Sequence, residues 1–454
     1  MGKLRVLAAS AALSAAALPL SAAGFRVPIE QFTLGNGLRV ALSPDHASPV
    51  IAVAVYYHVG SRDEEKGRSG FAHLFEHMMF QGSAHVKKGE IYSLVENNGG
   101  ILNGSTHPEY TDYFEMMPSD RLELALWLEA DRMRSLAVNA ENLKNQQEVV
   151  KEEKRLRVDN QPYVPSFLEM DEMLFRNWAN AHSVIGSMED LDAANLEDVK
   201  AFFRTHYAPN NAVLVIAGDF DPKEARGWVE KHFASIPGQK APDRPSLAEP
   251  DAVARTEKTT VDKLAKVPAV LIGWKVPGKL DRSSAAIDLL SDLLGDGEAS
   301  LLYQSLVKQQ QIAVSARAGY DESAGPSTFT VLVVERPGAD AKKSVAAVEA
   351  LVRRIQDKGA TDEELARARA LYKSERFSTG FQSLQTPLGR AEAIGWAALF
   401  DPDGAEGVNS EVARYDAVTA ADLRDAARKY LIPERRSVIE IEPPAKAPAS
   451  GGGR

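Results

Sequence analysis

Two histidines four residues apart, with a glutamate between them, are the side chains of this chain best placed to do chemistry. His73 and His77 occupy positions i and i+4 of the segment HLFEH. In an α-helix these positions share one face, one turn apart, so the two imidazoles can bind one zinc ion. Glu76 can act as a base toward a water molecule at the metal without being a ligand itself. The alternative is a chance spacing on a solvated helix face.

The residues around this motif predict a buried helix. Large apolar side chains occupy most of its remaining positions, namely Phe71, Leu74, Phe75, Met78 and Phe80. Two imidazoles and a carboxylate in such surroundings need polar partners, and a metal ion would supply them. The preceding segment Gly67–Gly70 predicts a loop, in which Ser69 is a candidate N-cap of the helix.

A third ligand is expected from a helix predicted over residues 140–159, which carries the adjacent acids Glu152 and Glu153. Glu153 shares a helix face with apolar residues one turn away, so it is expected to face the core. Glu152 has charged neighbours at the same spacing, so it is expected to face water. Two histidines and one glutamate would leave the fourth zinc position for water, as catalytic sites require. Spacing alone leaves open whether Glu153 is a ligand or a salt-bridged helix carboxylate.

Composition limits the protein class and the kind of metal site. With 454 residues, 44% of them hydrophobic, the chain is long enough for two domains with substantial cores. The net charge of −10 argues against nucleic acid as a partner. The absence of cysteine excludes disulfides, thiol nucleophiles and thiolate metal ligands. A metal must therefore be held by histidines and carboxylates.

The first 23 residues have the composition of an export signal. Lys3 and Arg5 precede an apolar run from Val6 to Leu20, and small residues follow at 21–23. This pattern predicts a signal peptide over residues 1–23 and a periplasmic mature protein. The apolar run is too short for a membrane span, and no other stretch is long and apolar enough for one.

One pattern of strands and helices occurs twice along the chain. Runs rich in β-formers at 50–60 and 269–278 are each followed by a charged turn and a helical segment. A helix, a proline-containing turn and a strand recur at 195–217 and 419–441. A repeat of about 220 residues predicts an α+β fold with two homologous domains, each a mostly antiparallel sheet packed with helices.

The domain boundaries follow from proline content and from the repeat. Five prolines and glycines among charged residues at 237–250 are typical of a linker. The expected division is a signal peptide 1–23, an N-terminal metal-binding domain 24–240, a linker 241–258, a C-terminal domain 259–443 without a metal site, and a disordered tail 444–454.

Several segments together resemble a known peptidase family. They are SRDE at 61–64, HLFEHMMF at 73–80 followed by QGS, NGST at 103–106, TDY at 111–113 and VVKEE at 149–153. The mature chain resembles the inverted-motif (H-x-x-E-H) zinc peptidases typified by pitrilysin, insulysin and the mitochondrial processing peptidase. Within that family it is most similar to the zinc-bearing subunit of a bacterial branch resembling the processing peptidase.

The resemblance implies an activity and assigns roles to residues. It implies a zinc endopeptidase with one zinc per chain, in which His73, His77 and Glu153 are the ligands and Glu76 is the base. It also implies that extended peptide substrate adds as a strand along the segment Ile101–Thr106, where Asn103, Gly104 and Ser105 would contact it. His107 could line the same cleft, whereas the other histidines, including His182, are interpreted as surface or packing residues.

Two departures from the family pattern bear on partners. The position of a supporting acid, seven residues before Glu153, holds Gln146, which can hydrogen-bond but carries no charge. An Arg and a Tyr that face the scissile carbonyl in active relatives align with Val307 and Val314. Losing one such donor typically costs about 100- to 1000-fold in turnover. The resemblance implies that a chain of two such domains forms half of a clamshell. We therefore expect a homologous chain to close over this chain and supply the Arg and Tyr, as a heterodimer, or secondarily a homodimer.

Other interpretations remain open at this point. Zinc alone could polarise the carbonyl, or the alignment over Val307 and Val314 could be shifted by a few residues. The chain could be a non-catalytic scaffold related to the core subunits of respiratory complexes, which have lost the metal motif. It could also be a zinc hydrolase that acts on something other than peptides.

Overall fold

The computed structural model describes residues 25–250, 255–378, 380 and 383–445. The predicted signal peptide 1–23 lies outside the described residues, as do residues 251–254 of the predicted linker and 446–454 of the predicted tail. Within the described ranges, no helix combines the length and the apolar character needed to cross a bilayer.

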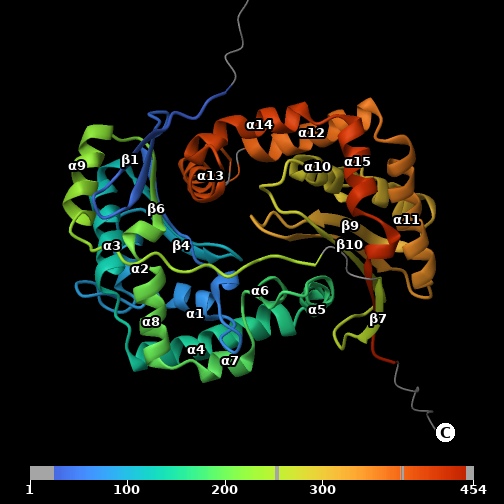
Figure 1. Ribbon diagram of the computed structural model, residues 1–454, viewed down its shortest axis with the longest axis horizontal. Coiled ribbons are helices and arrows are strands. Elements are labelled where there is room, and N and C mark those ends of the chain that lie inside the picture. The colour runs from blue at the N-terminus through green and yellow to red at the C-terminus, as the bar shows by residue number, and fades with distance from the viewer. Residues whose placement is uncertain (1–24, 251–254, 379, 381–382, 446–454) are drawn as a thin grey trace, which may run out of the picture.

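Two β-sheets form the framework, one in each half of the chain (Figure 1). The first sheet has the strand order β1-β2-β6-β3-β5-β4. Its strands are β1 (Glu30–Thr33), β2 (Arg39–Pro44), β3 (Val50–Tyr57), β4 (Ile101–Thr106), β5 (Thr111–Pro118) and β6 (Ala212–Gly218). The second sheet has the order β7-β11-β8-β10-β9. Its strands are β7 (Thr256–Val261), β8 (Ala269–Val276), β9 (Ala313–Tyr320), β10 (Ser327–Glu335) and β11 (Ser437–Glu442).

The two sheets repeat one topology, which confirms the predicted α+β fold of two similar domains. In each, one pair of strands is parallel, β2 with β6 and β7 with β11, and the other pairs are antiparallel. Strand β7 begins at Thr256, inside the range 241–258 that the sequence predicted as linker. The division into domains 24–240 and 259–443 stays a prediction.

Helices pack against both sheets (Figure 1). Those of the first half are α1 (Phe71–Met78), α2 (Glu90–Glu96), α3 (Leu122–Ser135), α4 (Ala140–Lys154), α5 (Val164–Leu174), α6 (Trp178–Ala181), α7 (Met188–Ala193), α8 (Leu196–His206) and α9 (Pro222–Phe233). Those of the second half are α10 (Ser284–Gly295), α11 (Ala341–Lys358), α12 (Asp362–Phe377), α13 (Pro387–Phe400), α14 (Gly407–Ala417) and α15 (Ala420–Tyr430). The described ranges also contain π-helical turns at Arg155–Asp159 and Tyr303–Gln309.

Each half of the chain contributes a helix to the other half's sheet. Helix α13 packs on β3 and β6 of the first sheet, and α5 packs on β8 and β11 of the second (Figure 1). Strand β3 is buried at seven of its eight positions, so both faces of its sheet must be covered by other elements. The two halves therefore complete each other's cores.

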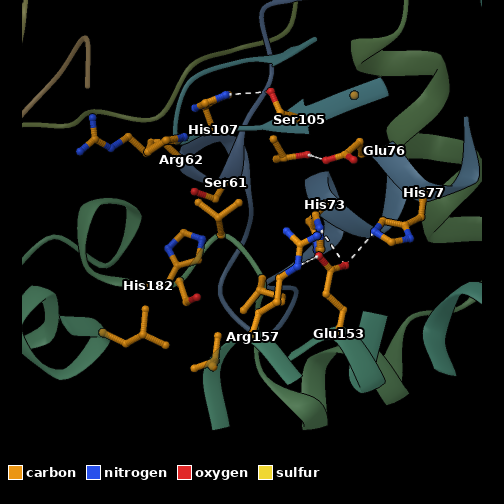
Figure 2. A pocket seen from close by; sticks show the side chains of 18 of the residues that line it. Ser61, Arg62, His73, Glu76, His77, Ser105, His107, Glu153, Arg157 and His182 are labelled. Carbon is orange, nitrogen blue, oxygen red and sulfur yellow. Dashed lines mark hydrogen bonds and ion pairs between the residues drawn. The ribbon is translucent and has the colours of Figure 1, made fainter. Parts of the chain in front are cut away.

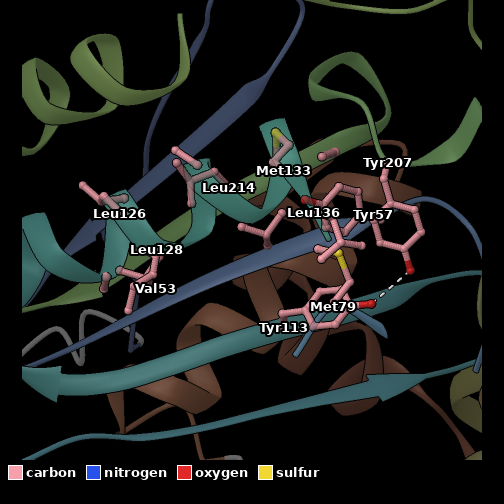
Figure 3. Packing of buried hydrophobic residues seen from close by; sticks show 14 of the residues in the cluster. Val53, Tyr57, Met79, Tyr113, Leu126, Leu128, Met133, Leu136, Tyr207 and Leu214 are labelled. Carbon is pink, nitrogen blue, oxygen red and sulfur yellow. Dashed lines mark hydrogen bonds between the residues drawn. The ribbon is translucent and has the colours of Figure 1, made fainter. Parts of the chain in front are cut away.

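The core beneath α1 fixes the position of the segment His73–His77. Phe75 on α1 packs on Tyr207 with ring centroids 4.3 Å apart. Met79, directly after α1, lies beside Tyr57 and Tyr113, and the Tyr113 and Tyr207 hydroxyls are 3.0 Å apart (Figure 3). These buried contacts hold the helix against the first sheet and leave its histidine face toward a cavity.

Candidate metal and catalytic site

The structure brings His73, His77 and Glu153 together, although Glu153 lies 76 positions after His77 in the sequence. One Glu153 oxygen, Oε2, lies 3.6 Å from His73 Nε2 and 3.1 Å from His77 Nε2. The three candidate ligand atoms all lie within 4.8 Å of one another (Figure 2). Helices α1 and α4 pack together and thereby place the three side chains around one point.

This donor set fits a zinc ion. Zinc bonds of roughly 2.0–2.1 Å in a tetrahedral arrangement separate neighbouring ligand atoms by roughly 3.3 Å. The two distances from Glu153 to the histidines, 3.1 and 3.6 Å, bracket that separation. Two imidazoles and one carboxylate leave one tetrahedral position open, which is the arrangement of catalytic rather than structural zinc sites.

The start of α1 is capped by a residue that sequence reasoning did not find. The candidate N-cap Ser69 was wrong, because Gly70, which has no side chain to act as a cap, occupies the N-cap position. The Ser69 hydroxyl donates instead to Asp190, at 2.5 Å. Glu64 takes over the capping, since its carboxylate accepts hydrogen bonds from the backbone N–H groups of Gly70, at 2.9 Å, and Ala72, at 2.7 Å.

His182 supports Glu64 from a distant part of the chain. Its Nε2 lies 2.9 Å from Glu64 Oε2, and its ring stacks on Trp178 with centroids 3.8 Å apart. Burial raises the pKa of Glu64. Burial alone would lower the pKa of His182, but the hydrogen bond and charge of Glu64, together with hydrogen bonds to the backbone of Trp178 and Ser61, outweigh it and raise that pKa. No local sequence signal links two residues so far apart, and the interpretation of His182 as a surface or packing residue overlooked this contact.

Glu76 is held by the neighbouring edge strand. The Thr106 hydroxyl donates a 2.6 Å hydrogen bond to Glu76 Oε2 (Figure 2). Among the described residues, the structure records no hydrogen bond to the other carboxylate oxygen of Glu76. Burial raises the pKa of Glu76, although the Thr106 hydrogen bond opposes that rise. The residue is thus oriented at one oxygen and available at the other.

Within the described part of the chain, no strand pairs with the outer edge of β4, which lies beside the histidines. Strand β4 is the last strand of its sheet and pairs with β5 along one side. Asn103, Gly104 and Ser105 of this strand line the same cavity as the histidines. The Ser105 hydroxyl donates a hydrogen bond to Asp112, at 2.5 Å. The same hydroxyl lies 2.9 Å from Nε2 of His107. Burial lowers the pKa of His107 to about 4.

The metal-site cavity has a volume of about 940 Å³ and is walled by both halves of the chain. Asp321, from the hairpin between β9 and β10, contributes to its wall from the second half. Val307 and Val314 do not line it, because Val307 packs against the second core and Val314 lies 55% exposed on β9. Val307 and Val314, which align with the Arg and Tyr of active relatives, therefore present no hydrogen-bond donor to the cavity.

Near Glu153, Gln146 does not take the expected supporting role, and Arg157 forms a contact that was not expected. Gln146 lines the cavity, but its amide donates to Asn145, at 2.8 Å, and not to a candidate ligand. Arg157, which sequence reasoning did not single out, forms an ion pair through its Nε with Glu153 Oε1, at 3.1 Å. Its position four residues after Glu153 on a helix is a readable signal for such a pair.

Comparisons with known proteins agree with this architecture. Residues 39–183 match the family described as "Insulinase (Peptidase family M16)", and residues 193–372 match that described as "Peptidase M16 inactive domain". The zinc protease PqqE of Helicobacter pylori is 29% identical over 91% of this chain and 93% of its own length. An uncharacterized zinc protease of Mycobacterium leprae is 30% identical over 70% of this chain and 72% of its own length.

Solved structures show the same fold. The crystal structure of a protease from Helicobacter pylori superposes with a TM-score of 0.86 at 27% identity, covering 92% of this chain and 100% of that one. The periplasmic protease PqqL from Escherichia coli gives a TM-score of 0.75 at 18% identity, covering 94% of this chain but 50% of PqqL. The present chain thus corresponds to half of the PqqL chain in fold.

Proposed function

Because this chain belongs to peptidase family M16, we propose that it is a zinc-dependent endopeptidase that cleaves extended peptides. The observation that carries the proposal is the convergence of Glu153 Oε2 on the Nε2 atoms of His73 and His77, with Glu76 on the same helix. His73, His77 and Glu153 would hold one zinc ion. When bound, zinc supplies Lewis-acid chemistry toward water and the peptide carbonyl.

The protein side chains then have distinct tasks. Glu76 takes a proton from the attacking water and later delivers it to the leaving amine. Thr106 keeps the Glu76 carboxylate aimed into the cavity through the 2.6 Å hydrogen bond. The free edge of β4 accepts the substrate as an added strand, with Asn103, Gly104 and Ser105 beside it, and binds the main chain with little regard to sequence.

The test is peptide cleavage by the purified chain with and without a chelator. We expect chelator to abolish cleavage and Glu76→Gln to lower turnover by about 100-fold or more while zinc remains bound. Glu153→Ala should lose zinc, whereas Glu152→Ala should keep it, because Glu152 points to solvent with its side chain 57% exposed and pairs with Arg155. Chelator-insensitive cleavage, or full activity of Glu76→Gln, would refute the proposal.

We further propose that a homologous chain closes the cavity. Val307 and Val314 offer no hydrogen-bond donor, and this chain matches half of PqqL in fold. A partner of similar length would supply Arg and Tyr side chains to the transition state, in a heterodimer or, as second choice, a homodimer. Adding the co-expressed partner should raise turnover by about 100-fold or more. Full turnover of a chain shown to be monomeric during assay would exclude this arrangement.

The non-catalytic scaffold is the second candidate, favoured by the match of residues 193–372 to the inactive domain of the family. The complete set of His73, Glu76, His77 and Glu153 supports the enzyme instead. Elemental analysis separates the enzyme from the scaffold, since a scaffold should be free of zinc.

We also propose export to the periplasm through residues 1–23. Mass analysis of the mature N-terminus tests this proposal.

A further inference from the structure

Arg157 lies beside the proposed zinc ligand Glu153, in the wide helical turn that follows it. Helix α4 passes directly into the π-helical turn Arg155–Asp159 without a break. π-helical turns inside longer helices often occur at functional sites. Arg157 lines the metal-site cavity (Figure 2). Its side chain is 78% exposed.

The two oxygens of Glu153 have different partners. Oε2 faces the two histidines, at 3.1 and 3.6 Å, whereas Oε1 lies 3.1 Å from Arg157 Nε. Among the described residues, the ion pair with Glu153 is the one recorded for Arg157. The position seven residues before Glu153, where an acid was expected, holds Gln146, whose amide is bound to Asn145. Support for the candidate ligand therefore comes from the following helical turn rather than the preceding one.

We propose that Arg157 is a positioning residue that fixes the rotamer of Glu153, so that Oε2 alone is presented to the metal. The inference rests on the proposed zinc site. A glutamate has several rotatable bonds, and outer groups that bind a ligand's second atom typically set its orientation. With Oε1 engaged by Arg157, the carboxylate stays turned toward His73 and His77 and does not chelate through both oxygens.

The positive charge of Arg157 also repels a cation, so two effects compete. Repulsion would make zinc bind more tightly when Arg157 is removed, whereas loss of orientation would make it bind more weakly. The Arg157 side chain is 78% exposed, so water and salt screen its charge. The carboxylate it holds is 18% exposed and lies beside His73 and His77. Orientation therefore dominates, and removal of Arg157 weakens zinc binding.

The test measures zinc affinity of the full chain by competition with a chromophoric chelator, without reference to turnover. Arg157→Ala should lower the affinity about 10-fold or more, within the range typical of outer-shell partners. Arg157→Lys, which keeps a cation without the planar fork, should recover part of that loss. Arg155→Ala is the matched control, because Arg155 pairs with Glu152 on the same helix at 2.9 Å, away from the histidines. It should leave the affinity unchanged.

A cobalt-substituted sample adds a spectroscopic readout. The visible absorption of bound Co²⁺ reports its coordination, so Arg157→Ala should change the spectrum and Arg155→Ala should not. Unchanged affinity and spectrum in Arg157→Ala, or tighter binding, would overturn the inference. So would a higher KM with unchanged zinc affinity, because that result would assign Arg157 to the substrate. If the unsubstituted chain binds no zinc, the proposed function itself fails, which is a distinguishable outcome.

Discussion

The hydroxyl of Thr106 donates a 2.6 Å hydrogen bond to Glu76, and this contact joins the edge strand β4 to α1, the helix that carries His73 and His77. The proposed base is thus oriented by the strand proposed to bind substrate. Thr106→Val keeps the shape of the side chain but removes the donor. We expect turnover to fall by about 10-fold, because a misaligned base transfers protons poorly. Steady-state kinetics at saturating zinc measure the loss.

Thr106→Ser is the matched control, since serine retains the hydroxyl at this position. It should keep most of the activity, and both variants should bind zinc as the unsubstituted chain does. Equal losses in the two variants would show that packing of the Thr106 methyl group, rather than the hydrogen bond to Glu76, matters.

A second prediction concerns the cap of α1. Glu64→Ala leaves the backbone N–H groups of Gly70 and Ala72 without an acceptor and removes the partner of His182. Unpaired buried donors and a lost cap each cost about 1–2 kcal/mol, so we expect the free energy of unfolding to fall by about 2–3 kcal/mol. Glu64→Gln keeps an acceptor oxygen and should lose less. Denaturant titration of both variants measures the difference, and equal stability of Glu64→Ala and the unsubstituted chain would contradict the capping role.

Part of the site could be predicted from the sequence because its geometry is local. His73 and His77 needed only the pitch of a helix to be placed together, and Glu76 needed only its position between them. Glu153 required more, since spacing left its role open and the family resemblance favoured it. The structure now brings it to both histidines. Its role as a ligand stays a proposal until metal binding is measured.

The remaining features depend on contacts that a linear pattern does not contain. His182 reaches Glu64 across 118 positions of sequence, and no periodicity connects them. Arg157 was within reach of sequence reasoning, because a cation four residues after Glu153 follows the ordinary helical rule. The β-rich run at 50–60 indicated a strand, but which helices cover its two faces depends on tertiary packing.

A third prediction concerns pH and the acidic face of α10. Burial, followed by the charges of Asp288, Glu375, Asp296 and Glu322, raises the pKa of Asp292 to about 8. The folded state therefore holds a proton on Asp292 that the unfolded state releases near pH 4. Because the folded state binds more protons over this window, the contribution of Asp292 to stability falls as pH rises from about 4 to about 8.

Asp292→Asn keeps the side chain neutral at every pH and so removes the destabilisation that ionisation of Asp292 causes at high pH. We expect the variant to exceed the unsubstituted chain in stability at pH 8 by about 1 kcal/mol, after allowance for solvent screening, and by less at pH 5. Thermal unfolding at the two pH values measures both differences. A gap of the same size at pH 5 and pH 8 would assign the effect to packing rather than to ionisation.

The final prediction tests whether the halves of the chain fold as one unit. Leu388 on α13 is 2% exposed and belongs to the apolar cluster that α13 forms with the first sheet, so Leu388→Ala leaves a cavity against strands of the other half. Such changes typically cost about 2–5 kcal/mol. Hydrogen exchange should therefore accelerate in β3, although the substitution lies far along the chain. Leu280→Ala, at a side chain 45% exposed, should change little. If hydrogen exchange in β3 stays slow while the second half opens, the packing of α13 on the first sheet does not couple the two halves.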